Sequence, residues 1–314
     1  MRLLRLIPDG TRIDFVGKRL PAFAFSIVLF VATLVSLATQ GLHLGIDFAG
    51  GILMEVQASQ EVDTASLRRS LNDLGLGGVE LQTFGGPRDV LIRIQQQQGG
   101  ENANRVAIEK VQQTLGDSYT YRRVELVGPK VGGELLREGL IATALAILSI
   151  TLYVAFRFEW QFGVAALVAT FHDVVTTVGI YTLLGFEFDL TSVAALLTLA
   201  GYSINDTVVV FDRIREVLRR QKGATMKDII NESVNSTLSR TILTSGTTLV
   251  AILPILLFGG PTLFSFTLAL TYGILIGTYS SIFVAGSLLL YLKPLRPGMN
   301  APAPATETSS AAEA

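Results

Sequence analysis

The sequence predicts a polytopic α-helical membrane protein with six transmembrane helices and one α/β domain outside the membrane. Composition is the first indication: 49% of the 314 residues are apolar and only 16% are charged, against about 25% charged residues in soluble domains. The second is a series of apolar runs, each close to or above the roughly 20 residues that a spanning helix needs. The third is one long polar stretch, residues 43–138, which is long enough to fold by itself.

Six apolar runs are predicted to cross the membrane: 21–42, 139–156, 162–185, 190–211, 241–258 and 263–292. The alternative for the first run is a cleavable secretory signal, whose apolar region would be only about 7–15 residues long. We therefore expect a basic N-terminal segment, residues 1–20, followed by an uncleaved span. The last five runs form a predicted bundle over residues 139–292. The tail, residues 293–314, is expected to be disordered because it cannot bury enough apolar surface to fold.

Within residues 43–138, strand and helix patterns alternate in the order βαββαβ, the order of a ferredoxin-like split unit. The predicted elements are strand 52–56, a helix after the N-cap Asp63, strands 79–83 and 89–94 joined by a Gly-Gly-Pro turn, helix 104–115 and strand 119–127. The pair Gly50 and Gly51 is interpreted as a tight backbone passage at the start of the domain, not as a ligand site.

The distribution of basic residues predicts the orientation of the spans. Seven Lys and Arg residues lie between positions 211 and 240, whereas the loops 185–189 and 259–262 contain none. By the positive-inside rule, the basic segment and both termini are cytoplasmic and the α/β domain is on the opposite side. Within the basic segment, residues 212–240 are predicted to form an amphipathic loop, with a helix on the membrane surface or under the bundle. A solvated charged face is the alternative interpretation.

Composition also excludes several classes of function. The chain has no cysteine and two histidines that are far apart in sequence, so no metal-ligand spacing is present. The net charge of −1 and the absence of an Arg/aromatic stripe argue against nucleic-acid binding. No paired carboxylates, Ser/His/Asp order or phosphate-binding loop stands out in the polar domain. We therefore expect neither enzymatic activity nor a cofactor.

The most informative position is Asp206, an acidic residue inside an apolar run. A charge at mid-membrane costs at least about 2.5–3.5 kcal/mol, so such residues usually face a protein interior or a water path and take part in function. Arg240 enters the membrane from the same side and is predicted to reach a similar depth, where its charge would respond to protonation of Asp206. The alternative is that Asp206 only holds neighbouring helices together.

Four other ionisable residues near or in the spans are secondary candidates. His172 and Asp173 lie near the middle of the third apolar run, where a relay and a bracing pair are both open interpretations. Asp212 and Arg213 lie at the cytoplasmic end of the fourth run, where a charged side chain can reach water at a low free-energy cost. We expect these last two to anchor the helix end.

Four sequence strings resemble the SecF family of membrane subunits of the bacterial Sec protein-export machinery. The most specific is NDTVVVFDRIRE at 205–216; the others are GIDFAGG at 45–51, VGPKVGGEL at 127–135 and VNSTLSRTILTSG at 234–246. The resemblance implies that Asp206 and Arg240 belong to a proton pathway, with protons as the coupling ion. It also places the chain in the bacterial inner membrane, with a periplasmic domain.

By the same resemblance, the chain would use the proton motive force, together with SecD, to promote late-stage export of polypeptides. Its implied partners are SecD, the SecYEG channel, YajC, membrane lipids and unfolded secretory polypeptides. An alternative function is half of a proton-driven small-molecule exporter of the resistance-nodulation-division type, although such pumps usually carry much larger outside domains. A third function, a non-transporting scaffold, would leave Asp206 and Arg240 without a role.

Overall fold

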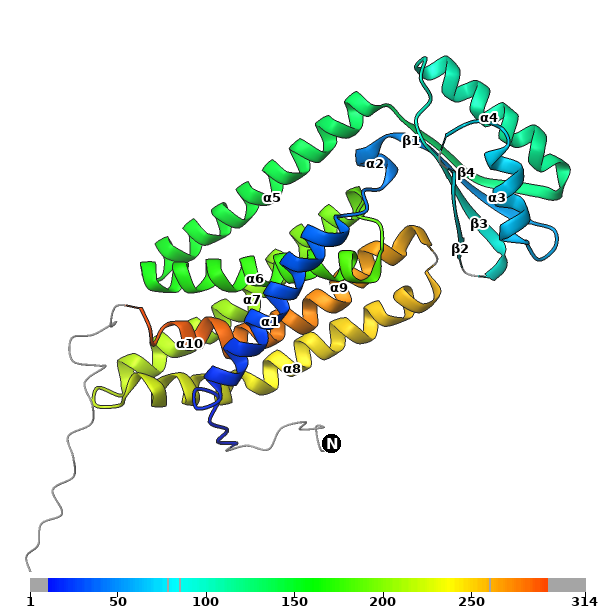
Figure 1. Ribbon diagram of the computed structural model, residues 1–314. Helices are drawn as coiled ribbons and strands as arrows, with labels where there is room; N and C mark the ends of the chain where they lie inside the picture. Colours follow the sequence, from blue (N-terminus) through cyan, green and yellow to red (C-terminus); the bar gives the residue numbers. More distant parts are fainter. Residues whose placement is uncertain (1–10, 78, 85, 260, 293–314) are drawn as a thin grey trace, which may run out of the picture.

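The computed structural model describes residues 11–77, 79–84, 86–259 and 261–292. A helical bundle carries a small α/β domain at one end, which we call the domain end of the bundle (Figure 1). In chain order the elements are α1 (Arg19–Gln40), α2 (Ile46–Ala49), β1 (Gly51–Ala58), α3 (Thr64–Asn72), β2 (Val79–Phe84), β3 (Gly86–Ile94), α4 (Glu101–Leu115), a 3-10 turn (Gly116–Ser118), β4 (Tyr119–Val127), α5 (Pro129–Arg157), α6 (Trp160–Leu184), α7 (Leu190–Arg220), α8 (Met226–Phe258), α9 (Pro261–Ser280), a π-helical turn (Ser281–Ala285) and α10 (Gly286–Leu288). The predicted tail, 293–314, and residues 1–10 lie outside the described residues.

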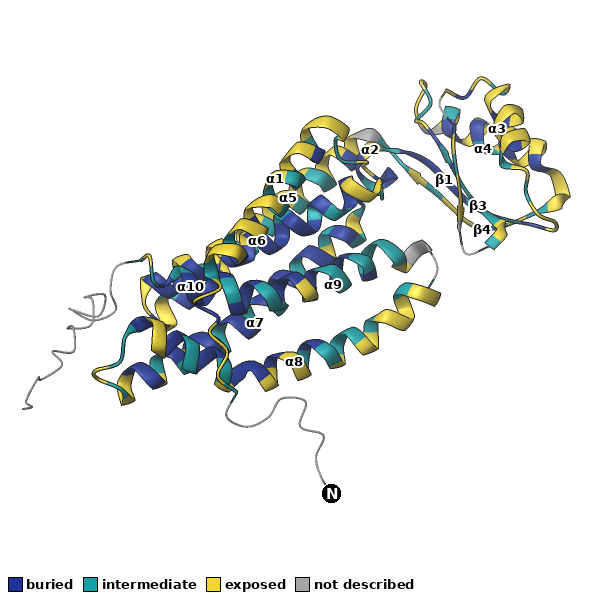
Figure 2. Ribbon diagram, turned by 60° about the horizontal axis from the view of Figure 1, so that its bottom comes forward, coloured by how far each residue is buried: buried dark blue, intermediate teal, exposed yellow. Residues whose placement is uncertain are grey.

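Six helices in the described part of the chain are long and apolar enough to cross a membrane, as predicted. They are α1, α5, α6, α7, α8 and the continuous helical segment made by α9, the π-helical turn and α10. Burial differs among them: 61% of the apolar window of α6 is buried, but only 6% of that of α5 and 11% of that of α8 (Figure 2). Helices α5 and α8 therefore present their apolar side chains to lipid or to another chain.

The α/β domain contains the predicted elements in the predicted order. Its four strands form one sheet in the order β2-β3-β1-β4, and each neighbouring pair is antiparallel. The carboxylate of Asp63 accepts a hydrogen bond from the Ala65 amide at 3.0 Å, which caps α3 as expected. The apolar core between the sheet and α3 and α4 includes Ile52, Met54, Val56, Leu71, Ile92 and Val111. The opposite face of the sheet is not covered by α3 or α4 and lies toward the bundle (Figure 1).

Between α1 and the sheet, the chain changes direction through more structure than the sequence suggested. A short helix, α2, precedes the strand and was not predicted. Gly50 and Gly51 follow with φ angles of 73° and 130°, which only glycine adopts readily. A Cβ on Gly51 would also stand 2.7 Å from the Ile94 carbonyl oxygen. The glycine pair is therefore a backbone requirement, as predicted.

Two predicted boundaries need correction. Helix α5 begins at Pro129, inside the segment assigned to the polar domain, because proline at the first helical position favours helix initiation. The predicted amphipathic loop, 212–240, is occupied by the end of α7 and the start of α8, which residues 221–225 join. Its apolar stripe packs into the bundle: Ile214 and Val217 are fully buried. The periodicity therefore reflects helix packing, and no separate surface helix forms there.

At the opposite end of the bundle, the segment before α1 lies against α8 and is hydrogen-bonded to it. The Asn235 side chain donates to the Ile13 carbonyl at 2.8 Å and accepts from the Ile13 amide at 2.9 Å. Asp14 accepts from the Gly17 amide at 2.7 Å and from Asn231 at 2.8 Å. These bonds, with Lys227 nearby, lower the pKa of Asp14 from 3.8 to about 2. We call residues 13–17 the N-terminal strap.

Candidate functional site

Asp173 on α6 is the centre of a buried hydrogen-bond network. Its side chain has no exposed surface. Ser203 of α7 and Ser280 of α9 each donate to Oδ2 at 2.6 Å, and His172 Nδ1 lies 2.9 Å from Oδ1. A buried carboxylate is tolerated when such donors surround it. Asp173 therefore joins α6, α7 and α9 at one point inside the bundle.

His172 joins this network through one ring nitrogen, and its other ring nitrogen is not part of the network. Its ring is 7% exposed, and Nδ1 faces the Asp173 carboxylate. The second ring nitrogen, Nε2, has no hydrogen-bond partner among the described residues. The ring centroid lies 6.4 Å from that of Tyr279, whose hydroxyl donates to the Ala22 carbonyl at 2.6 Å. These contacts fit a bracing pair, and the relay stays the second interpretation of His172 and Asp173.

Asp206 on α7 lies one turn beyond Ser203, and its surroundings differ from those of Asp173. The residue is 3% exposed, yet the hydrogen bond that Ser245 Oγ of α8 donates to Oδ2 is long, 3.5 Å, and Thr244 of the same helix is a second polar neighbour. Ser245 in turn shares a 2.7 Å hydrogen bond with Thr278 of α9. Protonation of Asp206 would therefore disturb fewer short hydrogen bonds than protonation of Asp173.

Arg240 lies in the same neighbourhood but does not contact Asp206 as the sequence suggested. Its charge acts on Asp206 through space. Among the described residues no ion pair joins the two, and the Arg240 side chain is exposed on the surface of the bundle. The physical reason is the position along α8: Ser245 and Thr244 are the α8 residues beside Asp206, whereas Arg240 lies more than one turn earlier with its side chain exposed.

The two remaining candidates are at the end of α7, outside this network. Asp212 is exposed, and Arg213 donates from Nε to Ser236 Oγ of α8 at 2.9 Å and pairs with Glu216. The Ser236 contact ties Arg213 of α7 to α8, whereas the Glu216 pair lies within α7. The anchoring role of Asp212 and Arg213 stays a prediction.

The close approach of α9 to α7 depends on two glycines. A Cβ on Gly273 would stand 2.5 Å from the Leu199 side chain, and one on Gly277 would stand 3.2 Å from Ser203 Cβ. Small residues spaced by four let membrane helices approach in this way. Directly after Ser280 the helix widens into the π-helical turn, where Ser281 shares a 2.9 Å hydrogen bond with Thr207. Such turns are often found at functional sites.

The sequence interpretation missed the interhelical hydroxyl groups: Ser203, Ser245 and Ser280, which bond to a carboxylate, and Thr278 and Ser281, which bond to other hydroxyl groups. A signal was available for one of them, because Ser203 and Asp206 are three residues apart and so lie on one helical face. The others are single hydroxyl residues in apolar runs. Such residues commonly bond to their own helix backbone, so their contacts with other helices could not be distinguished in advance.

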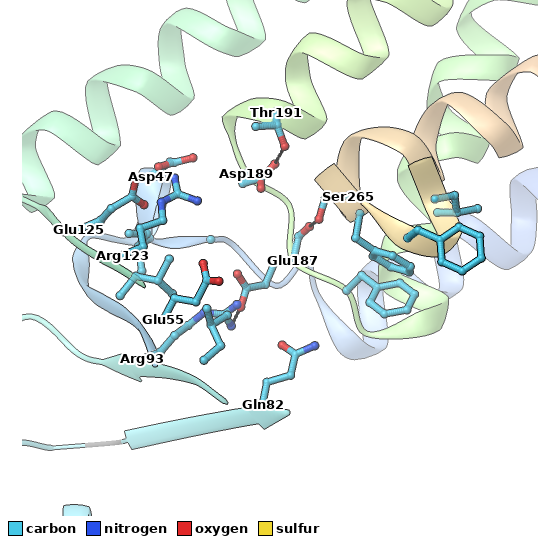
Figure 3. Close-up of a pocket in the computed structure, with 18 of the residues that line it drawn as sticks. Asp47, Glu55, Gln82, Arg93, Arg123, Glu125, Glu187, Asp189, Thr191 and Ser265 are labelled. Atoms are coloured by element: carbon cyan, nitrogen blue, oxygen red, sulfur yellow. Dashed lines mark hydrogen bonds and ion pairs between the residues drawn. The ribbon is translucent and has the colours of Figure 1, made fainter. Parts of the chain in front are cut away.

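A second feature lies outside the bundle core, between the open face of the sheet and the domain end of the bundle (Figure 3). This cavity has a volume of about 690 Å³. Arg93 of β3 forms an ion pair across it with Glu187 of the α6–α7 connection. Burial lowers the pKa of Arg93. The Asp47 carboxylate accepts from the Leu190 amide at 3.0 Å. Both contacts hold the domain against the bundle.

Nothing in the described ranges resembles a metal centre, because no group of three or more His, Cys, Asp or Glu side chains converges there. The titratable groups of the bundle interior are bonded mainly to hydroxyl groups. Proton transfer and hydrogen-bond exchange are therefore the chemistry that these residues offer.

Two family models match the chain. Residues 107–294 match "Protein export membrane protein SecD/SecF, C-terminal", and residues 35–62, which include the glycine pair, match "SecD/SecF GG Motif". Similar curated proteins include two named protein translocase subunit SecF. The one from Cereibacter sphaeroides is 44% identical over 92% of this chain and 92% of its own length. The one from Magnetococcus marinus is 46% identical over 93% of this chain and 95% of its own length.

Two solved structures of SecDF are similar in fold. The first, described as a translocon-associated membrane protein from Thermus, matches with a TM-score of 0.81 and 37% identity over 90% of this chain. The second, a super-membrane-facing form, matches with a TM-score of 0.65 and 38% identity over 89% of this chain. The chain spans 39% and 38% of those proteins. In each of those structures the matching region is one part of a longer chain.

Proposed function

Because this chain belongs to the SecD/SecF family of protein-export membrane proteins, we propose that it uses proton transfer at Asp206 to promote polypeptide export. The chain is a multi-pass membrane protein and a subunit of the protein translocase, like the relatives that it covers over most of their length. The coupling to the proton motive force, in a late stage of export, is our proposal. The relatives favour protein export over small-molecule export.

The observation that supports this proposal is the contrast between the two buried carboxylates. Asp173 takes part in three hydrogen bonds of 2.6–2.9 Å, two of them donated by serine hydroxyl groups, and is built into the packing of three helices. Asp206 is also buried, but its described side-chain neighbours come from one helix: Ser245 of α8 donates at 3.5 Å, and Thr244 and the cation Arg240 of the same helix lie nearby. Moving one charge across a membrane potential supplies about 2.3 kcal/mol per 100 mV. A carboxylate held this loosely can respond to that energy.

In this mechanism, protonation of Asp206 removes the negative charge that attracts Arg240, and deprotonation restores it. Arg240 is on α8, whose other contacts with Asp206 run through Ser245. A shift of α8 relative to α7 follows the exchange, and α8 ends at the cavity under the α/β domain. Protons are the coupling ion, and neither a cofactor nor enzymatic catalysis is required. The position of Arg240 on the bundle surface allows a partner chain to take part.

We infer that SecD covers the outward face of α7. Thr198, Gly201 and Asn205 are exposed there at successive turns inside the membrane segment, and a Cβ on Gly201 would meet no atom within 4 Å. Polar and small residues of this kind favour contact with another helix over contact with lipid. A cysteine in place of Asn205 should crosslink to SecD, and one in place of the exposed Leu148 of α5 should not. Equal crosslinking from both positions would contradict this interface.

The remaining partners and the cellular location are proposed on the same family basis. We propose a bacterial inner-membrane location with both termini in the cytoplasm, supported by the basic residues around the α7–α8 connection. The SecYEG channel, YajC and membrane lipids are the further partners. The unfolded polypeptide is contacted on the periplasmic side, where the α/β domain lies in this orientation.

The experiment is export into inverted membrane vesicles that contain this chain and SecD, with and without an imposed proton gradient. Asp206→Asn keeps the size of the side chain and removes the titrating proton, so it should abolish the gradient-dependent gain while the gradient-independent export remains. Arg240→Gln should give the same loss. Asp212→Asn, which removes an exposed carboxylate six residues further along the same helix, is the matched control and should retain the gain. Full gradient dependence in Asp206→Asn would refute the mechanism.

A further inference from the structure

The cavity at the domain end of the bundle has no part in the proposed proton path. Its volume of about 690 Å³ is within the usual range of ligand sites, roughly 300–1,000 Å³. One wall is the open face of the sheet, and the other is made by the ends of α8 and α9 with the α6–α7 connection (Figure 3). We call it the domain cleft.

The sheet wall of the domain cleft follows from strand alternation. Ile52, Met54 and Ile92 point into the core under α3 and α4, so their neighbours in sequence point to the other face. Glu55 is paired across the strands with Leu91 of β3 and with Arg123 of β4. This wall therefore offers an apolar side chain flanked by charged ones.

The bundle wall of the domain cleft is aromatic and aliphatic. Phe186 and Phe264 pack edge to face with ring centroids 5.0 Å apart. Leu257 and Phe258, at the end of α8, are 70% and 85% exposed. Uncovered apolar groups next to a polar wall are typical of a site for an amphipathic partner.

The charges around the domain cleft decide between two kinds of partner. Five carboxylates line it, those of Asp47, Glu55, Glu125, Glu187 and Asp189, against two guanidinium groups. Both guanidinium groups have carboxylate partners, since Arg93 pairs with Glu187 and Arg123 with Glu125. The excess of negative charge disfavours a lipid phosphate and favours a ligand with ammonium or guanidinium groups.

We propose that the domain cleft binds an extended polypeptide segment that carries apolar and basic side chains. Its apolar side chains lie against Phe186, Phe264 and Phe258. Its Lys or Arg side chains face Glu55 on the sheet wall, where they compete with Arg122, whose Nη1 lies 4.0 Å from the Glu55 carboxylate. This inference rests on the proposed function, because the exported chain is the polypeptide available on that side of the membrane. It adds a location and a side-chain preference that the proton mechanism does not require.

The test measures binding of short labelled peptides to the full chain in phosphatidylcholine nanodiscs by fluorescence anisotropy. The probe is a dansyl-labelled peptide of Leu, Ser and Lys; the comparison peptides have Glu or Ser in place of Lys. We expect the Lys peptide to bind most tightly. Equal binding of the Glu peptide, or no binding of the Lys peptide, would overturn the proposal.

Two variants and one control locate the binding. Leu91→Trp fills part of the cleft and should weaken binding of the Lys peptide about tenfold, as expected when a ligand's contact space is occupied. Glu55→Gln should weaken it about fivefold, the effect of one charge pair about 4 Å apart in a watery environment, and should leave the Ser peptide unchanged. Gln113→Trp, on the exposed face of α4 away from the cleft, should have no effect. Equal affinities in Leu91→Trp and Gln113→Trp would place the peptide elsewhere.

A crosslinking experiment in exporting vesicles keeps this proposal separate from the proton mechanism. Benzoylphenylalanine in place of Gln82, which lines the cleft, should crosslink to the exported polypeptide, whereas the same group in place of Gln113 should not. Adducts with lipid alone would overturn the proposal. Asp206→Asn should bind the Lys peptide with normal affinity, so loss of gradient coupling and loss of peptide binding can be told apart.

Discussion

Replacement of Asp173 by alanine should destabilise the bundle more than replacement of any exposed carboxylate. The substitution removes the acceptor of three hydrogen bonds, from His172, Ser203 and Ser280. The donors come from α6, α7 and α9, and all three residues are buried. No water can reach these donors readily, so each loses its partner without compensation.

The expected magnitude can be bounded from these contacts. Hydrogen bonds between membrane helices average about 0.6 kcal/mol in double-mutant cycles, and three of them give about 2 kcal/mol. A buried donor left without a partner costs about 1–3 kcal/mol in soluble proteins, which sets a higher limit. We expect a loss of about 2–5 kcal/mol in the free energy of unfolding. Asp173→Asn should lose only about 1 kcal/mol, because the amide oxygen still accepts and a serine hydroxyl can rotate to accept from the amide group.

The assay is unfolding by sodium dodecyl sulfate in mixed micelles, followed by far-ultraviolet circular dichroism of the helices. Asp212→Ala is the matched control, since it removes an exposed carboxylate from the same bundle, and it should change the unfolding free energy by less than about 0.5 kcal/mol. Wild-type stability in Asp173→Ala, or an equal loss in the control, would show that the carboxylate network does not hold the helices together.

Three other predictions follow from local geometry. Because folding lowers the pKa of Asp14 from 3.8 to about 2, its stabilisation of the N-terminal strap is complete above about pH 4 and is lost as the pH falls toward 2. Pepsin cleavage of the strap should therefore rise more steeply over this range in the wild-type chain than in Asp14→Asn. Identical cleavage profiles for the two chains would contradict this prediction. Gly277→Leu should destabilise the bundle by about 1–3 kcal/mol through overpacking, whereas Gly201→Leu, in open space, should have little effect in the isolated chain, as unfolding measurements would show. In this cysteine-free chain, single cysteines at the exposed Gln98 and Lys222 should react with impermeant maleimide from opposite sides of the membrane; labelling of both from one side would exclude the six-span arrangement.

The number of spans, the element order of the α/β domain and the glycine passage could all be predicted from the sequence. Each depends on a local property: the length of an apolar run, a periodicity of two or 3.6 residues, or a backbone angle that one residue type allows. The N-cap Asp63 belongs to the same class, since its hydrogen bond closes within two residues. The amphipathic stripe at 214–218 was visible too, but its partner was not, because a periodicity reveals that a face is covered without revealing what covers it.

The candidate site was predictable only in part. The sequence by itself determined that Asp206, His172 and Asp173 lie within membrane-spanning segments, since that follows from the apolar runs around them. Only the tertiary structure decided which hydroxyl groups surround each carboxylate, that Ser245 and not Arg240 faces Asp206, and that the sheet encloses a cleft with the domain end of the bundle. The reason is that the rotation of each helix and its depth against its neighbours are set by side-chain packing between segments far apart in sequence, and no local pattern records that packing.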